Sequence, residues 1–314
     1  MSLTSAQIKS KARELGFDAC GIAAVGDHAE LKFFSTWLER GYAASMDYLA
    51  RTADMRADVR AAFPNPTAVI MTATIYNTEQ PSAAPDDPAI AKIARYARGE
   101  DYHAVVGRRL EALLKWMHDV SPEPFSACPY VDTGPIQERV YAKHAGIGWI
   151  GKNSCLISPE IGSFVFLGEI ICNLPLECDE PALDQCGTCT LCIEACPTHA
   201  IVGDGVLDAN RCISYLTIEH RGDIDPALRP AMGSHIFGCD ICQDVCPWNS
   251  TAPLSRDPAW QPRAAWDSPK LVDLLHTSDH ALQAALRDSP MKRAKVQGLR
   301  RNVEIAAENA NIAR

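Results

Sequence analysis

The stretch CGTCTLCIEACP, residues 186–197, decides how the middle of this chain folds. Its cysteines follow the spacing C-x2-C-x2-C-x3-C-P, the run with which bacterial ferredoxins hold 4Fe–4S clusters. A partial second copy, GCDICQDVCP at residues 238–247, supplies three more cysteines, and Cys212 lies between the two copies. Eight thiolates suffice for two such clusters, so the sequence predicts a protein that transfers single electrons.

The spacing also predicts which cysteines share a cluster. In two-cluster ferredoxins the first three cysteines of a run surround one cluster, and the fourth ligates the other. Cys212 replaces the first cysteine of a regular second run, with His235 as an alternative ligand. Two structural zinc sites, which also use C-x2-C pairs, are the competing interpretation. The expected cluster ligands are Cys186, Cys189, Cys192 and Cys246 for the first cluster, and Cys196, Cys212, Cys239 and Cys242 for the second.

The overall composition is that of an ordinary soluble protein with two or three domains. The chain has 314 residues, of which 47% are hydrophobic and 22% charged. It begins without the apolar core of a signal peptide, and its 13 cysteines are an odd number. Reduced thiols used as metal ligands therefore fit better than disulfides, which predicts a cytoplasmic protein. The longest apolar run, residues 163–172, contains Glu169 and is typical of a strand, not of a membrane span.

The charge balance bears on nucleic-acid binding. The formal net charge of −9 argues against bulk, non-specific binding, although it does not exclude a local basic surface. One stretch, residues 291–301, is either a contact for phosphate groups or a solvated helix face. It carries no acidic residue and five basic ones: Lys292, Arg293, Lys295, Arg300 and Arg301.

Three regions are expected along the chain: an α/β or α+β domain at residues 1–175, a ferredoxin-like module at 176–258, and a C-terminal helical segment at 259–314. The first region is expected to contain helices near residues 5–15, 30–40, 86–98, 103–120 and 136–144, and strands near 68–76, 129–131, 155–158 and 163–172, the last two paired as a hairpin. The others are expected to contain a helix at 207–219 that points Cys212 inward, a linker at 251–266, and two or three short helices after 268 that resemble one unit of a helical repeat.

The first region is far larger than an electron carrier needs, so it is expected to hold a substrate, a cofactor or a partner. It has no G-x-G-x-x-G after a strand and no P-loop, so a Rossmann nicotinamide site is unsupported. Its glycine-rich stretch GIGWIGKNS, residues 146–154, either lets the backbone approach a bulky ligand or forms a tight loop before a strand.

Four blocks together resemble the epoxyqueuosine reductase family: VDTGPIQERVYAKHAGIGWIGKNSC, CGTCTLCIEACPTHAI, CISYLTIEHRG and GCDICQDVCPWN. The resemblance implies an enzyme, similar in layout to the reductive dehalogenases, with a nitroreductase-like core that binds base-off cobalamin and receives electrons from the two clusters. The implied reaction converts the epoxide of epoxyqueuosine in a tRNA anticodon loop to an alkene and water, which needs two electrons and two protons.

The resemblance implies that Asp132 is the proton donor. This role requires a pKa raised by desolvation against the cofactor. The structural alternative is that Asp132 or Thr133 caps the helix after Pro135. If both ideas hold, Thr133 is the cap and Asp132 faces the cofactor.

The resemblance also suggests contacts and partners. The basic stretch at 291–301 is the expected contact for tRNA phosphates, an unidentified low-potential donor supplies electrons, and a monomer is expected. Cys20, Cys128, Cys155, Cys172 and Cys178 are expected to be buried and without a role. The candidate cobalamin contacts are Arg56, Tyr96, Tyr102, His103, Arg139, Lys143, Asn153, Ser154 and His220.

Two other functions remain open at this level. A corrinoid reductase of a small molecule, similar to the dehalogenases, would bind the cofactor but ignore tRNA. A non-catalytic electron-transfer subunit would bind clusters and no corrinoid.

Overall fold

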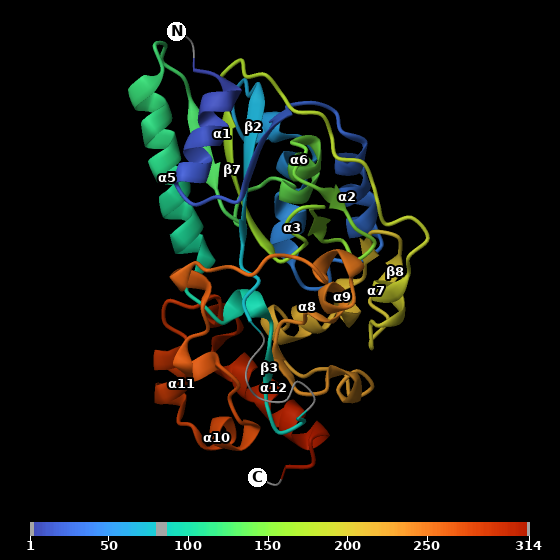
Figure 1. Cartoon of the computed structure of the whole chain (residues 1–314). Helices are drawn as coiled ribbons and strands as arrows, with labels where there is room; N and C mark the ends of the chain where they lie inside the picture. The colour runs from blue at the N-terminus through green and yellow to red at the C-terminus, as the bar shows by residue number, and fades with distance from the viewer. Residues whose placement is uncertain (1–2, 80–86, 313–314) are drawn as a thin grey trace.

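The computed structural model describes residues 3–79 and 87–312. One half of the molecule is a sheet flanked by helices, the other half is built mainly from the C-terminal helices, and the short helices α7, α8 and α9 lie beside the junction (Figure 1). The two ends of the chain lie at opposite ends of the molecule. Within the described part of the chain, no helix is long and apolar enough to cross a membrane.

The sheet is antiparallel and has the strand order β1-β2-β7-β4. Its strands are β1 (Ala19–Ala24), β2 (Ala68–Ile75), β4 (Ala127–Tyr130) and β7 (Val165–Cys172). Every residue of β2 is buried, because the strand lies in the middle of the sheet and has side chains packed on both faces. This is the reason for the continuous apolar run near residues 68–76, and the strand predicted there is confirmed.

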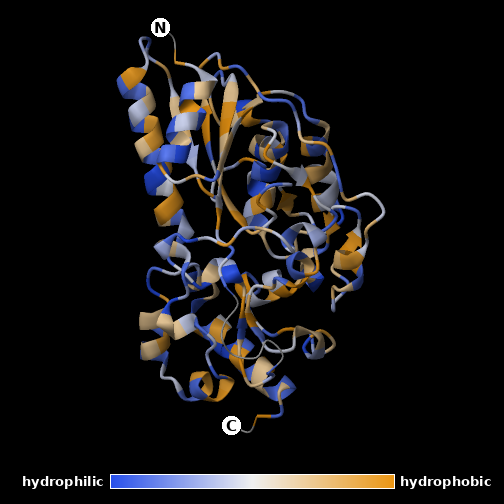
Figure 2. Cartoon of the chain, viewed as in Figure 1, coloured by the Kyte–Doolittle hydropathy of each residue, from blue (hydrophilic) through white to orange (hydrophobic). Residues whose placement is uncertain are grey.

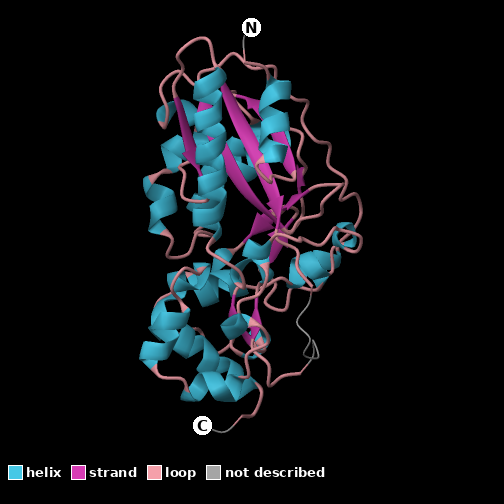
Figure 3. Cartoon of the chain, turned by 60° about the vertical axis from the view of Figure 1, so that its left-hand side comes forward, coloured by secondary structure: helices cyan, strands magenta, loops and turns pink. Residues whose placement is uncertain are grey.

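Helices cover both faces of the sheet (Figure 3). The first face packs against α1 (Ser5–Glu14) and α5 (Tyr102–Val120), and the second against α2 (Ala29–Glu39) and α6 (Glu138–His144). In α5 the residues Leu110, Leu113 and Met117 form one fully buried stripe, and burial of each such side chain contributes about 1.5–3 kcal/mol. The orange colour of the central strands in Figure 2 reflects the same two-sided burial.

The cysteine-bearing region is made of short elements. Two single-turn helices, α7 (Leu191–Glu194) and α9 (Ile241–Asp244), pack against each other and belong to the two cysteine runs. The other elements of this region are β8 (Ile201–Gly203), β9 (Val206–Leu207), η3 (Ala209–Arg211), α8 (Ile213–Ile218), η4 (Pro230–Met232), β10 (His235–Phe237) and η5 (Pro247–Asn249).

The C-terminal helices form a separate hydrophobic cluster around Leu271, Leu299 and Val303. These helices are α10 (Leu271–His276), α11 (Asp279–Ala285), η8 (Pro290–Ala294) and α12 (Lys295–Asn309). The remaining elements are α3 (Asp47–Arg51), α4 (Ala53–Ala57), η1 (Val59–Ala61), β3 (Lys92–Ile93), η2 (Arg95–Ala97), β5 (Trp149–Ile150), β6 (Leu156–Ile157), η6 (Pro258–Trp260) and η7 (Ala264–Trp266).

The helix predicted near residues 86–98 is wrong. Residue 86 lies outside the described residues, and the rest forms β3 and the 3-10 turn η2. The segment is extended because β3 pairs in parallel with β10, and its residues Ala91, Ile93 and Ala97 join the C-terminal hydrophobic cluster. The limits of the three predicted regions stay a prediction. Ala91, Ile93 and Ala97, which belong to the first region, nevertheless pack in the hydrophobic cluster of the third.

Two other predicted elements need correction. The strands near 155–158 and 163–172 do not pair as a hairpin: β6 pairs with β5, whereas β7 pairs with β2 and β4. A single bridge between Ser158 and Gly162 is what joins the two segments. The helix predicted at 207–219 is interrupted, because Cys212 has extended backbone angles and separates η3 from α8.

The predicted linker at residues 251–266 is folded. Trp260 is 2% exposed and packs against Phe166 of the sheet, with a ring-centroid separation of 4.8 Å. Trp266 is buried in the C-terminal cluster. The segment therefore joins the two halves through two anchored indole rings.

We expect Trp260→Ala to lower the free energy of unfolding by about 3–5 kcal/mol, because it removes a large buried side chain. Leu254→Ala, in the same segment but 51% exposed, is the matched control and is expected to change it by less than about 0.5 kcal/mol. Denaturant titration measures both variants. Equal stability of the two variants would show that residues 251–266 are a linker after all.

Candidate active site

Asp132 lies on the loop between β4 and α6. Its φ is +59°, in the left-handed region, and its backbone N–H donates a 2.6 Å hydrogen bond to Oε1 of Glu138. Its side chain is 58% exposed. The N-cap of α6 is Gln137, so the expectation that Asp132 or Thr133 caps this helix is wrong. The loop extends beyond residue 133 before the helix begins, and this leaves the Asp132 carboxylate free for other partners.

His103 joins Asp132 to a second carboxylate. Its Nε2 lies 3.3 Å from Oδ2 of Asp132, and its Nδ1 lies 2.7 Å from Oδ1 of Asp101. Asp101 is buried at the N-cap of α5 and accepts a 2.6 Å hydrogen bond from Nζ of Lys292. The result is a continuous row of alternating charges, from Lys292 through Asp101 and His103 to Asp132.

The protonation of this row differs from the sequence-based expectation. Burial by itself would lower the pKa of His103, but hydrogen bonds to Asp101 and Asp132 outweigh it and raise that pKa to about 9. Burial would raise the pKa of Asp132, yet hydrogen bonds from His103 and Tyr102 lower it. The expected rise in the pKa of Asp132 is therefore absent from this form, in which the proton between the two groups resides on His103.

Several predicted cofactor contacts surround Asp132. Tyr102 stacks on Phe166 with ring centroids 4.6 Å apart, and Tyr96 meets Tyr102 edge to face at 6.1 Å. Arg139 is exposed and acts electrostatically on Asp132. Arg56 is half-buried and donates to the backbone oxygen of Ile136 in the Asp132 loop, at 3.0 Å.

Four other predicted cofactor contacts have partners away from Asp132. Lys143 forms an ion pair with Glu30 of α2. The Asn153 side-chain amide donates to the Cys242 carbonyl at 3.2 Å, and the Ser154 hydroxyl donates to the Gly205 carbonyl at 3.0 Å. The His220 ring bonds the Asp223 carbonyl at 2.9 Å. Each of these groups serves a local structural contact.

The basic stretch divides into two groups. Arg300 donates to the final carbonyls of α10, and Arg301 donates to carbonyls of α8 and the turn after it, so both are internal supports. Lys292, Arg293 and Lys295 are exposed, and the first two reach toward the site. Lys292 bonds Asp101, while Arg293 pairs with Glu219 at 2.8 Å and 2.9 Å and lies 5.6 Å above the Tyr48 ring.

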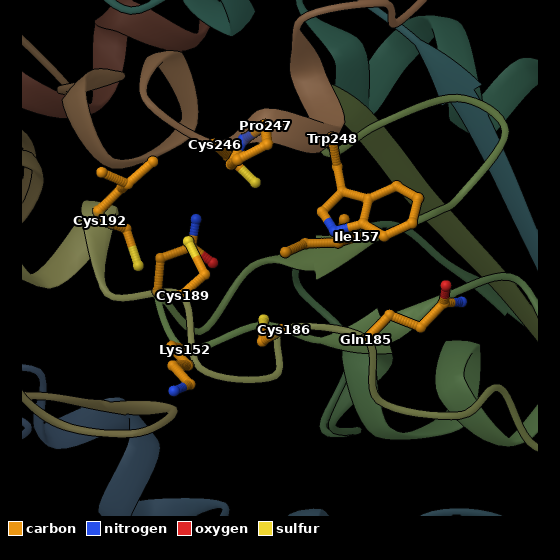
Figure 4. Close-up of a pocket in the computed structure, with 11 residues that line it drawn as sticks. Lys152, Ile157, Gln185, Cys186, Cys189, Cys192, Cys246, Pro247 and Trp248 are labelled. Atoms are coloured by element: carbon orange, nitrogen blue, oxygen red, sulfur yellow. The ribbon is translucent and has the colours of Figure 1, made fainter.

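The cysteines form two groups. Figure 4 shows the sulfur atoms of one group turned toward a common hollow that Lys152 and Trp248 also line. This group is Cys186, Cys189, Cys192 and Cys246. In the second group the thiols interact electrostatically with one another, and its members are Cys196, Cys212, Cys239 and Cys242. The grouping matches the spacing argument, while the ligand assignment itself stays a prediction.

The geometry of these groups favours clusters over zinc. A zinc site needs four ligands about 2.3 Å from one ion. Within residues 3–79 and 87–312, no three His, Cys, Asp or Glu side chains converge closely enough for a single metal ion. A 4Fe–4S cluster attaches each thiolate to a different iron atom, so its four sulfurs surround a larger space. His235 is buried, bonds the Met232 carbonyl at 2.9 Å through Nδ1, and has Lys92 and Asp244 as its electrostatic neighbours, whereas Cys212 has Cys196. These surroundings favour Cys212 over His235 as the ligand.

Hydrogen bonds from N–H groups support the cysteine loops. The Trp149 indole N–H donates to the Cys186 sulfur at 3.3 Å, and the Ala200 N–H donates to the Cys196 sulfur at 3.2 Å. Hydrogen bonds to ligand sulfurs are one of the means by which proteins set cluster potentials. Of the five cysteines expected to be buried, only Cys172 is fully buried. Cys20, Cys128 and Cys155 are half-buried, and the expectation is wrong for Cys178, which is exposed.

The sequence analysis missed three acidic residues of this site: Asp101, Glu138 and Glu169. Asp101 had a local signal, because an aspartate two residues before His103 stands at a helix N-cap position. Glu138 lies in the first block that resembles the family, and no local pattern in the sequence marks it as a site residue. Glu169 stood out as a charge in an apolar run, but its neighbours come from other elements and no sequence pattern names them.

Comparisons with known proteins point to one family. Residues 185–249 match the model of a 4Fe-4S double cluster binding domain, and residues 56–133 match the model described as epoxyqueuosine reductase QueG, DUF1730. The epoxyqueuosine reductase of Gloeobacter violaceus is 43% identical over 98% of this chain and 96% of its own length. That of Vibrio cholerae is 42% identical over 97% of this chain and 83% of its own.

Solved structures agree. A crystal structure of an epoxyqueuosine reductase with an epoxyqueuosine-modified tRNA-Tyr stem loop has a TM-score of 0.89 and 29% identity, over 98% of this chain and 82% of that one. A Bacillus subtilis epoxyqueuosine reductase, with the catalytic loop of an aspartate swung out of its active site, also has a TM-score of 0.89, with 27% identity over 98% of this chain and 82% of that one.

The iron content of paired cysteine variants tests the crossed arrangement. If Cys246 shares a cluster with Cys186, the double variant Cys186→Ala/Cys246→Ala keeps one cluster, about four iron atoms per chain, and Cys242→Ala/Cys246→Ala keeps none. An uncrossed arrangement reverses these results. Cys178→Ala alters an exposed thiol outside both groups and is expected to retain about eight iron atoms. Iron and sulfide analysis after anaerobic purification measures all three.

Proposed function

This chain belongs to the epoxyqueuosine reductase family and is an oxidoreductase, and from that premise we propose that it reduces epoxyqueuosine to queuosine in the anticodon loop of tRNA. The observation that carries the proposal is the exposed Asp132 carboxylate 3.3 Å from Nε2 of His103, in a fold similar to that of an epoxyqueuosine reductase solved with the modified stem loop. We also propose that the protein acts in the cytoplasm, as a tRNA substrate suggests, and that it acts as a monomer.

The reaction needs electrons, and two 4Fe–4S clusters on the eight cysteines would deliver them one at a time. We propose cobalamin as the acceptor. Its amide-rich rim would suit the donors that stand around Asp132: Tyr102, Arg56 and Arg139. When bound, it would supply the low-potential electron pair that carbon–oxygen cleavage needs. Because both ring nitrogens of His103 already face carboxylates, His103 is not proposed as a cobalt ligand, in agreement with a base-off cofactor.

The residues of this chain would manage the protons. Asp132, in its acid form, donates a proton to the oxygen that leaves carbon as the epoxide opens. Before substrate binds, the raised pKa of His103 and the lowered pKa of Asp132 favour this proton on His103, whose Nε2 lies 3.3 Å from Oδ2 of Asp132. A substrate that covers the exposed Asp132 carboxylate would raise the pKa of Asp132 and lower that of His103, because desolvation disfavours both charges. Substrate binding would thus move the proton from Nε2 of His103 to Oδ2 of Asp132.

The exposed basic residues near the site are proposed to hold the anticodon stem loop. Enzymes that act on a base take it out of the stack, and cationic side chains fix the surrounding phosphates. Lys292, Arg293 and Lys295 are exposed and are the proposed phosphate contacts, although Lys292 also bonds Asp101 and Arg293 also pairs with Glu219. Arg300 and Arg301 are less suited to this role because they donate to internal carbonyls. The net charge of −9 makes such a local contact more specific than a general attraction to nucleic acid.

Replacement of Asp132 tests the proton-donor role. With clusters and cobalamin reconstituted anaerobically, Asp132→Asn is expected to lower the rate of epoxyqueuosine loss from tRNA at least about 100-fold, because the amide cannot donate the proton. Asp119→Asn, at an exposed ion pair far along α5, is the control and retains the wild-type rate. Nucleoside analysis of the digested tRNA measures the product. Undiminished activity of Asp132→Asn would end the proposal for this residue.

The pH dependence tests the proton store. The pKa of His103 in the free enzyme is raised to about 9, so the proton is available below this pH. We therefore expect kcat/KM, which reports the free enzyme, to fall as the pH rises through about 9. His103→Gln, which keeps a hydrogen bond but cannot carry the proton, is expected to be slow throughout and to lack this fall. If the two pH profiles had the same shape, His103 would not be the store.

A further inference from the structure

Glu169 is the most unusual buried group outside the steps described above. It lies on the central strand β7 and is 0% exposed. In the part of the chain that the structure describes, no donor reaches either of its side-chain oxygens. A buried carboxyl without a donor is costly, and an ionised one is far more so. Glu169 therefore requires a proton of its own or a neighbour that shares one.

That neighbour is another carboxyl group, Glu138 of α6. Both carboxyl groups lie against the Asp132 loop: Glu138 accepts the Asp132 N–H at 2.6 Å, and Glu169 Oε1 lies 3.1 Å from the place of a Cβ atom on Gly134. Two buried carboxyl groups beside one another are not both ionised, so one of them carries a proton. Burial raises the pKa of Glu169 well above its ordinary value, and burial together with Asp132 raises that of Glu138 to about 7. The pair behaves as one unit that keeps a proton between its members across the neutral range.

The sheet neighbours of Glu169 are mainly apolar, whereas Glu138, Asp132 and Arg56 act on it electrostatically from other elements. In the sheet register Glu169 lies opposite Met71 of β2 and Tyr130 of β4, and the buried Ile171 follows two residues later on the same face. A leucine at this position would suit these neighbours and would avoid the cost of a buried acid. The acid is thus unfavourable for packing, and its benefit must lie in what it touches.

The Glu138–Glu169 pair lies directly beneath the Asp132 loop. Glu138 Oε1 accepts the Asp132 N–H at 2.6 Å. A Cβ atom added to Gly134 would come within 3.1 Å of Glu169 Oε1 and 2.7 Å of the Tyr130 side chain, so the loop backbone rests against the pair. The hydrogen bond from the Asp132 N–H to Glu138 fixes the Asp132 backbone at a φ of +59°. Residues other than glycine adopt this left-handed conformation uncommonly.

We propose that Glu169 and Glu138 form a one-proton latch that positions Asp132 for the reaction. Neutral Glu169 donates its proton in a hydrogen bond to the Glu138 carboxylate, and this carboxylate accepts the Asp132 N–H. A hydrogen bond to an ionised acceptor is about twice as strong as one between neutral groups. The latch fixes the left-handed turn from which the Asp132 side chain projects. Glu169 and Glu138 are positioning residues in this inference, which rests on the proposed function of Asp132.

The latch also affects the charge of Asp132. The Glu138–Glu169 pair carries one negative charge when it holds one proton. This charge lies next to the Asp132 loop. A nearby negative charge disfavours ionisation of a carboxyl group. The charge of the pair therefore raises the pKa of Asp132, whereas His103 lowers it. This charge favours the protonated form of Asp132 once substrate covers the site.

Two substitutions at Glu169 test the latch. Glu169→Gln keeps a donor of nearly the same shape and is expected to retain kcat within about threefold. Glu169→Leu removes the donor and is expected to lower kcat about 100-fold, the order of loss seen when a catalytic group is misplaced by an ångström, while KM for the tRNA changes less than about threefold. The leucine variant is expected to be at least as stable as the wild type, so a loss of rate would not come from unfolding.

Hydrogen exchange of the Asp132 amide separates this inference from the proposed function, because it needs no activity. The amide is expected to exchange at least about tenfold faster in Glu169→Leu than in the wild type or Glu169→Gln, as expected for a weakened hydrogen bond to a charged acceptor. Unchanged exchange in the leucine variant would overturn the latch. Loss of activity in both variants would also overturn it, since the glutamine retains the donor, and would show that the Glu169 proton itself is consumed. If exchange follows the prediction while no variant or wild type acts on epoxyqueuosine, the latch stands and the proposed substrate is wrong.

Discussion

A buried hydrogen-bond cluster around Ser163 joins the cysteine-bearing region of this protein to its sheet. The Gln243 side chain, between two cysteines of the second run, donates to the Ser163 carbonyl at 2.9 Å. The Asn249 side chain accepts the Ser163 N–H at 2.7 Å and donates to the Ser163 hydroxyl at 2.8 Å. Ser163 leads into β7, so the strand that anchors a cysteine loop is also the strand that carries Glu169. The cysteine-bearing region and the buried Glu169 carboxyl are thereby attached to the same strand.

The close packing at this junction explains why residue 162 is a glycine. A side chain at Gly162 would come within 2.4 Å of the Asn249 side-chain oxygen, and the φ of Gly162 is +72°. The backbone can approach the second cysteine run only without a Cβ atom. The Asn153 amide adds a further bond to the Cys242 carbonyl. The glycine-rich stretch at residues 146–154 thus supports the cysteine loops. Asn153 and Ser154, which the resemblance suggested as cofactor contacts, donate to the Cys242 and Gly205 carbonyls.

The sequence was sufficient where the signal is local. The cysteine spacing, the α5 stripe and the buried run of β2 are short patterns with a direct physical cause, and the structure has each element where it was expected. It was insufficient where partners come from distant segments. The segment near residue 92 is extended because of a strand more than a hundred residues later, and Arg301 is occupied by carbonyls of α8. The protonation of Asp132 likewise depends on His103 and Glu138, whose approach follows from the packing of α5 and α6 around the sheet.

In the proposed reaction, electrons held by the cysteine-bound clusters reach the substrate at Asp132. Stopped-flow absorbance on the anaerobic, cluster-loaded protein tests this directly when pre-reduced chain is mixed with epoxyqueuosine-containing tRNA. With cobalamin present, the clusters are expected to reoxidise at the rate at which the epoxide disappears, with two electrons used for each nucleoside converted. Clusters that remain reduced while the epoxide is lost, or that reoxidise equally fast without cobalamin, would contradict the account.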